Sequence, residues 1–334
     1  MKILTIGSDR QLFDATSEVR RRTLNLTSNF TELKIIVLAE KSLGFNPEQI
    51  APNSWIYPTN SIGRLNYIWD AVRLGKNLRD SQMVSAQDPF ECGLAAWLIN
   101  RHLRAKLELQ IHTDLGSPYF WQESIKNKIR FLMAKFLLPR ADNIRVVSER
   151  IKNFLTHHFS LPASKITVRP IAVNTEQIKT APIKTDLHKK YPQFDKIILM
   201  ASRLTKEKNI GLAIEAMREI VKARPRTGLI VVGSGPEEKK IKFLTSYFSL
   251  SENIVFEPQL NQETLYSYYK TCDLFLLTSW YEGYGMTLIE AQAAGGKIIS
   301  TDVGVARAVG AIITDFSVTT LVEKILRLFQ SRSS

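Results

Sequence analysis

The sequence of 334 residues has little of what stabilises small secreted or metal-bound domains. It holds only two cysteines, Cys92 and Cys272, without any CxxC pair. This excludes a disulfide framework and argues against a cysteine-based metal site. No run of about 18 apolar residues occurs, and the segment MKILTIGSDR lacks the apolar core of a signal peptide. We therefore expect a cytoplasmic protein, with any membrane contact restricted to peripheral association on the inner face.

Several nucleotide-binding motifs are also missing. Gly233 and Gly235 are followed by Glu238 where a dinucleotide-binding fingerprint requires glycine. No GxxxxGK[ST] segment is present, which excludes P-loop phosphotransfer. The absence of an Asp-x-Asp pair removes the usual carboxylate ligands for a divalent metal on a diphosphate. We expect neither a metal nor a cofactor.

The composition indicates a folded, basic protein of two domains. Its length exceeds what one hydrophobic core usually supports, and 44% hydrophobic with 23% charged residues is typical of globular chains. The net charge of +13 is uneven, with 24 basic and 15 acidic residues in positions 1–173. This excess favours anionic partners. We expect phosphates or an acidic membrane surface rather than nucleic acid.

Short β-rich runs alternate with amphipathic helical patterns along the whole chain, which is typical of βα units with parallel sheets. The expected strands are 2–6, 33–39, 82–86, 107–112 and 143–148, followed by 196–201, 228–233, 253–256, 274–278, 297–301 and 311–314. This pattern predicts two doubly wound Rossmann-like domains of about six strands each, with ligands bound at the carboxyl ends of the strands. A polar stretch at 173–192 predicts a linker between an N-terminal domain, 1–173, and a C-terminal domain, 174–334.

A basic loop joins an expected strand to an expected helix in the second domain. Asn209 is a suitable N-cap for a helix that ends before Pro225. Arg203 and Lys208 precede this helix. A guanidinium fork and a mobile ammonium beside a helix N-terminus can clamp a diphosphate. Most such clusters are merely solvated basic loops, so the downstream sequence decides between the two interpretations.

The segment 278–296 places two carboxylates eight positions apart, Glu282 in a glycine-containing loop and Glu290 in the following helix. Carboxylates accept hydrogen bonds from the hydroxyls of a sugar or ribose. Gly283 and Gly285 let the backbone approach a ligand and present amides to phosphate at a helix N-terminus. Together these features indicate a nucleotide-sugar site.

In this order and spacing, the motifs resemble those of retaining GT-B glycosyltransferases of family four, the glycosyl transferases group 1. The resemblance rests on E-x7-E at Glu282 and Glu290, on SRL-x3-K at 202–208, and on the glycine-rich turn at 232–236. It implies two Rossmann-like domains facing a central cleft. It also implies that Arg203 and Lys208 bind the diphosphate, that Glu290 binds the ribose and that Glu282 contacts the donor sugar. The implied donor site also includes two glycines of the turn, Gly233 and Gly235. It further includes the loop residues Gly283, Tyr284 and Gly285, and the first helical residues, Met286 and Thr287.

The N-terminal half carries weaker signals. His112 lies at the end of an expected strand and is similar to the family's cleft histidine, which implies a place beside the transferred sugar. A lone histidine is more often structural, but the end of a strand lies where ligands bind. Four further candidates for the acceptor side stand after expected strands, namely Ser8, Asp9, Asp88 and Ser148. Asp88 has a second interpretation, as the cap of the next helix.

Residues 121–140 combine an apolar stripe with basic residues around it. The stripe consists of Trp121, Ile125, Ile129, Leu132, Met133 and Phe136. A basic amphipathic helix can lie on an anionic membrane. An ordinary helix packed on the N-terminal sheet shares this pattern, and we expect that arrangement here.

The predicted function is that of a retaining, metal-independent hexosyltransferase. Its catalytic residues are predicted to be His112, Arg203, Lys208 and Glu282. It would move a hexose from a nucleotide-diphosphate sugar to a glycan or a lipid-linked acceptor in cell-surface glycan synthesis. Two alternatives remain, a catalytically idle glycosyltransferase-like scaffold or regulatory subunit, and a sugar-nucleotide epimerase. The scaffold is suggested by an altered first βα turn at 7–13 and by a chain that ends soon after Leu328.

Overall fold

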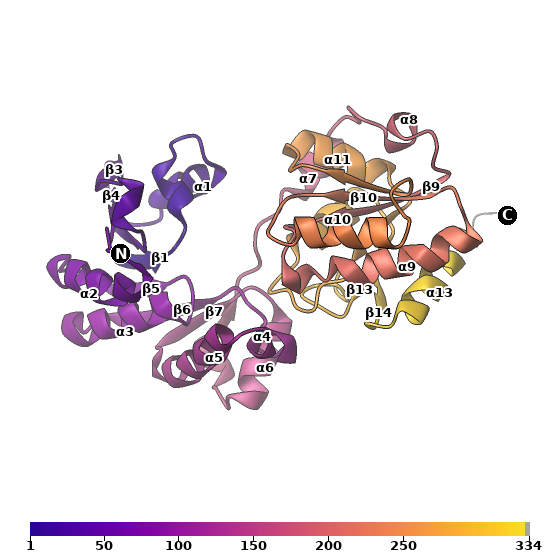
Figure 1. Cartoon of the computed structure of the whole chain (residues 1–334). Helices are drawn as coiled ribbons and strands as arrows, with labels where there is room; N and C mark the ends of the chain where they lie inside the picture. The colour runs from indigo at the N-terminus through magenta and orange to yellow at the C-terminus, as the bar shows by residue number, and fades with distance from the viewer. Residues whose placement is uncertain (331–334) are drawn as a thin grey trace. The chain divides into compact units, whose positions relative to one another are not determined.

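The computed structural model describes residues 1–330 and divides the chain into two compact units (Figure 1). The N-terminal unit comprises Met1–Pro170 and the C-terminal unit begins at Ile171. This boundary lies three residues before the expected one. The stretch expected to be a linker contains two short helices, α7 (Thr175–Thr180) and α8 (Leu187–Lys190), whose buried Ile178 and Leu187 belong to the core of the C-terminal unit.

The N-terminal unit is built on an eight-stranded sheet in the order β3-β4-β2-β1-β5-β6-β7-β8, in which only β3 runs antiparallel to its neighbour. Its strands are β1 (Lys2–Gly7), β2 (Glu32–Val37), β3 (Glu48–Ala51), β4 (Ser54–Pro58), β5 (Met83–Ala86), β6 (Lys106–Ile111), β7 (Asn143–Val146) and β8 (Ile166–Val168). Its helices are α1 (Glu18–Thr27), α2 (Tyr67–Asn77), α3 (Glu91–Leu103), α4 (Pro118–Gln122), α5 (Ile125–Leu137) and α6 (Glu149–His158). Short 3₁₀ turns occur at Arg10–Phe13, Lys41–Leu43, Arg64–Asn66, Leu138–Arg140 and Ala163–Lys165.

The C-terminal unit has a six-stranded, fully parallel sheet in the order β11-β10-β9-β12-β13-β14. Its strands are β9 (Lys196–Ala201), β10 (Thr227–Val232), β11 (Ile254–Glu257), β12 (Leu274–Leu277), β13 (Ile298–Thr301) and β14 (Ile312–Thr314). The remaining helices are α9 (Ile210–Ala223), α10 (Glu238–Tyr247), α11 (Gln262–Thr271), α12 (Met286–Ala293) and α13 (Val318–Gln330), with a 3₁₀ turn at Lys206–Lys208.

The central strands are largely buried because helices cover both faces of each sheet (Figure 1). In β10, for example, all six residues are buried. In both sheets the strand order reverses beside the first strand of the unit, between β1 and β5 and between β9 and β12. Loops diverge at such a switch point and leave room for a ligand at the carboxyl ends of the strands.

The expected doubly wound α/β class is confirmed, but the strand count of the N-terminal unit was underestimated. The short edge strands β3 and β8, and β4 beside β3, lack the long apolar run that identifies a central strand. Helix α9 follows Asn209 and ends at Ala223, as its pattern predicted. The side chain of Asn209 does not cap it, however, because this residue adopts a left-handed conformation with φ of 48° and forms no capping hydrogen bond with its side chain.

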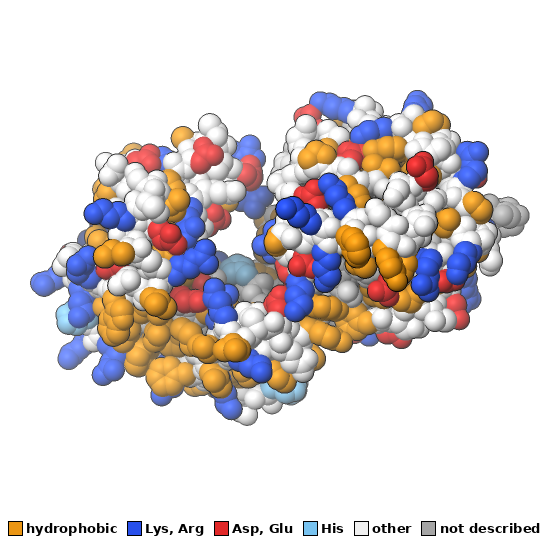
Figure 2. Space-filling model, viewed as in Figure 1, with side chains coloured by type: hydrophobic (Ala, Val, Ile, Leu, Met, Phe, Trp, Pro, Cys, Tyr) orange, Lys and Arg blue, Asp and Glu red, His pale blue; other side chains and the backbone are white. Residues whose placement is uncertain are grey.

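The expectation that the apolar stripe of α5 packs on the N-terminal sheet is wrong. Ile125, Ile129, Leu132 and Phe136 are exposed, at 77%, 54%, 63% and 43% of their surface. The helix instead buries Asn127, Ala134 and Leu137. Of the stripe, Phe136 contacts α3, where its ring lies edge-on to that of Trp97 at 5.3 Å. Figure 2 shows hydrophobic side chains gathered over this part of the N-terminal unit.

Candidate active site

In the C-terminal unit, the two loops that carry the sequence motifs flank the switch point of the sheet. The basic loop at 202–208 follows β9, and the loop at 278–285 follows β12, its neighbour in the sheet. A hydrogen bond from the backbone N–H of Trp280 to the carbonyl of Glu207, at 2.8 Å, joins them. The hydroxyl of Thr278 also donates to the carbonyls of Lys208 and Asn209, at 3.1 and 3.0 Å. The two motifs therefore form one site.

Lys208 and Glu282 meet at the centre of this site. The Lys208 Nζ lies 2.5 Å from Oε1 of Glu282, and the two side chains are only 12% and 13% exposed. The hydroxyl of Ser279 donates to the same carboxylate oxygen at 2.8 Å. A largely buried ion pair with an additional hydrogen bond has a defined geometry, because removing either partner would leave a buried charge uncompensated.

Arg203 lies at the open side of the same loop. Its side chain is 77% exposed, and its guanidinium lies 3.4 Å from Oε1 of Glu207. The hydroxyl of Thr205 donates to that carboxylate oxygen as well, at 2.6 Å. The long contact and the high exposure make this a weak ion pair. Arg203 can therefore reorient toward an anionic ligand at little cost.

Gly233 and Gly235 support the basic loop through the backbone. A Cβ at Gly233 would lie 2.0 Å from the carbonyl oxygen of Ser202, and its φ of 138° is a conformation that side chains rarely adopt. A Cβ at Gly235 would lie 2.4 Å from the carbonyl oxygen of Leu204. The N–H of Leu204 also donates to the carbonyl of Ser234 at 2.9 Å. Both glycines thus let the 233–237 turn pack directly against the basic loop.

The second loop leads into α12 through Gly285, which has a φ of 85°. Met286 and Thr287 open the helix, so their backbone N–H groups are among those without a partner inside it. Glu290 lies on the second turn of α12, and its carboxylate accepts a hydrogen bond from the Tyr269 hydroxyl at 3.0 Å. Burial and the nearby Glu290 raise the pKa of Tyr269 well above its ordinary value, so this phenol stays a donor.

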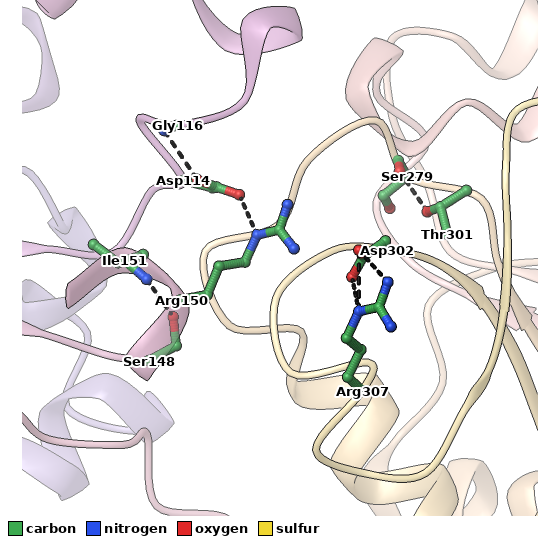
Figure 3. A network of polar contacts seen from close by, with 9 residues as sticks. All are labelled: Asp114, Gly116, Ser148, Arg150, Ile151, Ser279, Thr301, Asp302 and Arg307. Carbon is green, nitrogen blue, oxygen red and sulfur yellow. Dashed lines mark hydrogen bonds and ion pairs between the residues drawn. The ribbon is translucent and has the colours of Figure 1, made fainter. Parts of the chain in front are cut away.

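The structure adds a third segment, which follows β13 and was missed at the sequence level. The hydroxyl of Thr301 donates to the carbonyl of Ser279 at 2.6 Å (Figure 3). The N–H of Val305 donates to the carbonyl of Tyr284 at 2.9 Å, and a Cβ at Gly304 would lie 2.3 Å from that carbonyl oxygen. The signal that could have found this segment is its position after a strand adjacent to β12. It holds the loop that carries Glu282 and Gly283.

In the N-terminal unit, His112 lies at the carboxyl end of β6. One of its ring nitrogens lies 3.3 Å from the side-chain oxygen of Gln110, which also accepts a hydrogen bond from Arg145. The residue is exposed at the surface, but the surrounding protein partly desolvates its ring. This desolvation, together with the positive charge of Arg145, lowers the pKa of His112 to about 4. The imidazole is therefore neutral at physiological pH.

Three of the four acceptor-side candidates use their side chains to cap helices. Asp9 accepts from the N–H of Gln11 at 3.1 Å, at the start of a 3₁₀ turn. Asp88 accepts from the N–H groups of Phe90 and Cys92 at 2.8 and 3.2 Å, which is the capping role given as its alternative. Ser148 is the N-cap of α6 and is buried (Figure 3). The fourth candidate, Ser8, is exposed.

Asp114 follows β6 and was not singled out by its sequence context. Its carboxylate is almost fully buried and accepts hydrogen bonds from the N–H of Gly116 and from Arg150, both at 3.0 Å (Figure 3). These bonds hold the loop after β6 against α6.

Among residues 1–330, no group of three histidine, cysteine or acidic side chains is arranged to hold a metal ion. Within the same range, no helix has the length and apolar character to span a bilayer.

Known protein families resemble both halves of the chain. The family model described as glycosyl transferases group 1 matches residues 184–334, and that of glycosyltransferase family 4 matches residues 19–177. The chain is 24% identical over 228 residues to an alpha-monoglucosyldiacylglycerol synthase of Streptococcus pneumoniae, covering 65% of this chain and 51% of that protein. It is 30% identical over 184 residues to an N-acetylgalactosaminyltransferase of Campylobacter jejuni that acts on a diphospho-undecaprenol acceptor, covering 53% and 47%. The match spans about half the length of each of these two relatives.

Among solved structures, sucrose-phosphate synthase from Thermosynechococcus elongatus matches with a TM-score of 0.81 at 17% identity, covering 99% of this chain and 90% of that one. HepE of Anabaena, solved with UDP, matches with a TM-score of 0.74 at 18% identity, covering 100% and 91%. These likenesses establish the GT-B architecture of two Rossmann-like domains. The two family models together cover nearly the whole sequence, and the chain belongs to the group 1 glycosyltransferases.

Proposed function

We propose that this protein is a retaining, metal-independent hexosyltransferase that uses a nucleotide-diphosphate sugar and acts on a lipid-linked or glycan acceptor. The observation that carries the proposal is the arrangement of Lys208, Glu282 and Ser279 at the switch point of the C-terminal sheet. It provides a cation for a diphosphate and a carboxylate for sugar hydroxyls within one hydrogen-bonded group. Relatives named for glycosyl transfer to lipids support the same function.

Donor binding rearranges the ion pair between Lys208 and Glu282. The diphosphate competes for the ammonium of Lys208, and the exposed Arg203 turns toward the same phosphates. As Lys208 shifts, Glu282 becomes available to accept hydrogen bonds from the hydroxyls of the sugar, while Ser279 continues to orient it. Fixed cations near the leaving diphosphate then stabilise the charge that develops in the transition state.

Transfer follows a front-face route. The bond between the anomeric carbon and the diphosphate oxygen breaks, and the acceptor hydroxyl oxygen forms its new bond on the same face. The leaving phosphate takes the acceptor proton. Glu282 and Glu290 are assigned to sugar and ribose hydroxyls, which leaves neither of them as the nucleophile of a double displacement. His112 is neutral and in this proposal contacts the donor sugar.

The charge needed at the diphosphate comes from Arg203, Lys208 and the N-terminus of α12, so activity should persist in excess EDTA. Loss of activity that Mg²⁺ or Mn²⁺ alone restores would contradict this part of the proposal.

The acceptor is proposed to be presented at an anionic membrane surface, in the synthesis of cell-surface glycans. The segment from Ile125 to Arg140 carries five cations and no carboxylate. The exposed apolar side chains of α5 lie among them. Such a face combines burial of apolar side chains in a membrane with attraction to acidic headgroups.

The decisive test is a panel of UDP- and GDP-hexoses, with release of the nucleoside diphosphate measured in the presence and absence of acceptor lipid extract. An active donor shows acceptor-dependent release, and NMR coupling constants of the product show the same anomeric configuration as the donor. An inverted product would refute the mechanism. Absence of release with every donor would favour the idle scaffold.

A further inference from the structure

The N-terminal unit contains an aromatic cavity that the proposed donor chemistry does not use. Its volume is about 460 Å³, and it lies among α4, α5, α6 and the loop after β6. Apolar side chains from each of these elements line it, including Leu115, Trp121, Phe131, Phe154 and Phe159. An apolar cavity of about 150 Å³ already holds benzene in other proteins. This cavity can therefore accommodate a considerably longer hydrocarbon segment.

The walls of the cavity are fixed by contacts between aromatic rings. Phe131 packs edge-on against Phe159 at 5.9 Å, and Phe154 packs edge-on against the same ring at 5.6 Å. The ring of His158 stacks on Phe154 at 4.6 Å. Such contacts hold each side chain in one orientation. The cavity is therefore preformed, which lowers the entropic cost of filling it.

A second hollow adjoins the cavity. Its volume is about 250 Å³, and it shares three lining residues with the cavity, namely Gly116, Phe154 and His158. The second hollow is also lined by polar side chains, among them Asn153 and His157. A ligand that fills both hollows needs an apolar part and a hydrogen-bonding part.

The residues that line the cavity include one lysine and no carboxylate. Lys135 lines the cavity itself and is exposed. Across the described residues 1–330, no carboxylate forms an ion pair with it. The neighbouring Arg130 is different, because it forms an ion pair with the carboxylate of Glu91, whose oxygens lie 3.0 and 3.1 Å from its nitrogens. Lys135 is thus the cation available to an anionic ligand at the mouth.

We propose that this cavity binds the hydrocarbon chain of a phosphate-bearing lipid acceptor, with Lys135 contacting the phosphate. The identification of the ligand as the acceptor rests on the proposed function, whereas the binding of the chain does not. The exposed apolar side chains of α5 belong to the same helix as Phe131 and Lys135, which line the cavity. In this proposal that face rests on the membrane, so a lipid enters the cavity without leaving an apolar environment.

Binding of alkyl phosphates below their micelle concentration tests the proposal without any nucleotide sugar. Calorimetry with octyl, nonyl and decyl phosphate should give saturable binding of one molecule per chain. Affinity should rise about fourfold for each added methylene, since burying one contributes about 0.8 kcal/mol. Inorganic phosphate alone should bind at least about a hundredfold more weakly than decyl phosphate, because it buries none of the chain.

Three variants locate the site. Trp121→Glu should weaken decyl phosphate binding by about tenfold or more, because it places a carboxylate at an apolar wall. Lys135→Glu should weaken decyl phosphate but leave the uncharged octyl glucoside unchanged. Trp69→Glu is the matched control, because Trp69 is 69% exposed on α2 and lies outside the cavity. It should change neither affinity. Thermal unfolding of each variant checks that it is folded.

Several results would overturn the proposal. One is equal binding by the wild type and Trp121→Glu, and another is photo-crosslinking of a diazirine alkyl phosphate to peptides outside 115–160. Loss of co-sedimentation with phosphatidylglycerol vesicles in Trp121→Glu, with decyl phosphate binding unchanged, would assign this residue to general bilayer contact. A dimer in light scattering that Trp121→Glu disrupts, without alkyl phosphate binding, would assign the surface to a second copy of the chain.

If the alkyl phosphates bind as expected but no donor is turned over, the proposed function fails and the cavity assignment stands as a lipid-chain site.

Discussion

The two sheets use their switch points differently, although their topologies correspond. In the C-terminal unit, side chains from separate loops contact one another, as Lys208, Ser279 and Glu282 do. In the N-terminal unit, Asp9 and Asp88 instead accept hydrogen bonds from the start of the next helical segment. A carboxylate used in this way stabilises the fold and is less available to a ligand. The position of a residue at a strand end is therefore insufficient evidence that it contacts a ligand. The hydrogen-bond partner of its side chain determines whether the residue is available to a ligand.

This difference also separates the ligands expected for the two units. Fixed charges and closely packed glycine turns suit a diphosphate, which is similar in every nucleotide sugar. The N-terminal unit offers a neutral histidine and an aromatic cavity, which suit a ligand with a large apolar part. Variants in the two units should therefore affect different quantities.

The largest effect is expected for Lys208→Ala. It removes a cation from the diphosphate and leaves Glu282 largely buried without its ionic partner, so kcat/KM should fall on the order of 10²-fold. Steady-state kinetics with the active donor measure this change. Lys206→Ala is the matched control, because Lys206 lies in the same loop and is exposed. A comparable loss in both variants would attribute the effect to the general charge of the loop.

Gly233→Ala should weaken donor binding next most strongly. The new Cβ meets the carbonyl of Ser202 and forces a strained φ, which costs about 1–3 kcal/mol and displaces the basic loop. Calorimetry should show a donor affinity lower by about tenfold or more.

Gly211→Ala provides the control for that change within the same unit. Gly211 lies in α9, and a Cβ there would approach no atom closer than 3.9 Å. Alanine should raise the free energy of unfolding by about 0.5–1 kcal/mol, since glycine is unfavourable inside a helix. Wild-type donor affinity in Gly233→Ala would contradict the assigned role of the turn.

Asp88→Ala should act on stability alone. It removes the acceptor for two backbone N–H groups at the start of α3, and loss of such a cap costs about 1 kcal/mol. Urea denaturation should show this loss, while donor affinity stays at the wild-type value. A selective change in acceptor KM without a change in stability would restore Asp88 as an acceptor ligand.

The sequence was sufficient for the parts of the molecule where local pattern and chemistry coincide. Apolar runs identified the central strands, and the spacing of Glu282 and Glu290 identified the loop and helix that carry them. Prediction from the sequence failed where contacts between distant parts of the chain determine which side chains are covered. The sequence of α5 cannot show which side of the helix is covered, because that depends on the packing of Ala134 and Leu137. Likewise, the role of Thr301 depends on a contact with Ser279, 22 positions away.

The smallest effect concerns His112, and it appears as a pH dependence. Its pKa of about 4 in the folded protein lies below the usual value for histidine of about 6.5. Between these two values the unfolded chain binds more protons at this site, and stability rises with pH wherever that holds. The contribution of His112 is therefore fully present above pH of about 6.5 and is lost as the pH falls toward 4. His112→Asn should flatten the stability profile in that range, as measured by urea denaturation at a series of pH values.

The same pKa implies that His112 causes no inflection in turnover between pH of about 5.5 and 8, so a contact with the donor sugar would be made by the neutral ring throughout. An NMR titration of the imidazole C–H signals provides the direct measurement, and a midpoint near 6.5 would contradict both the desolvation of this ring and the stability profile.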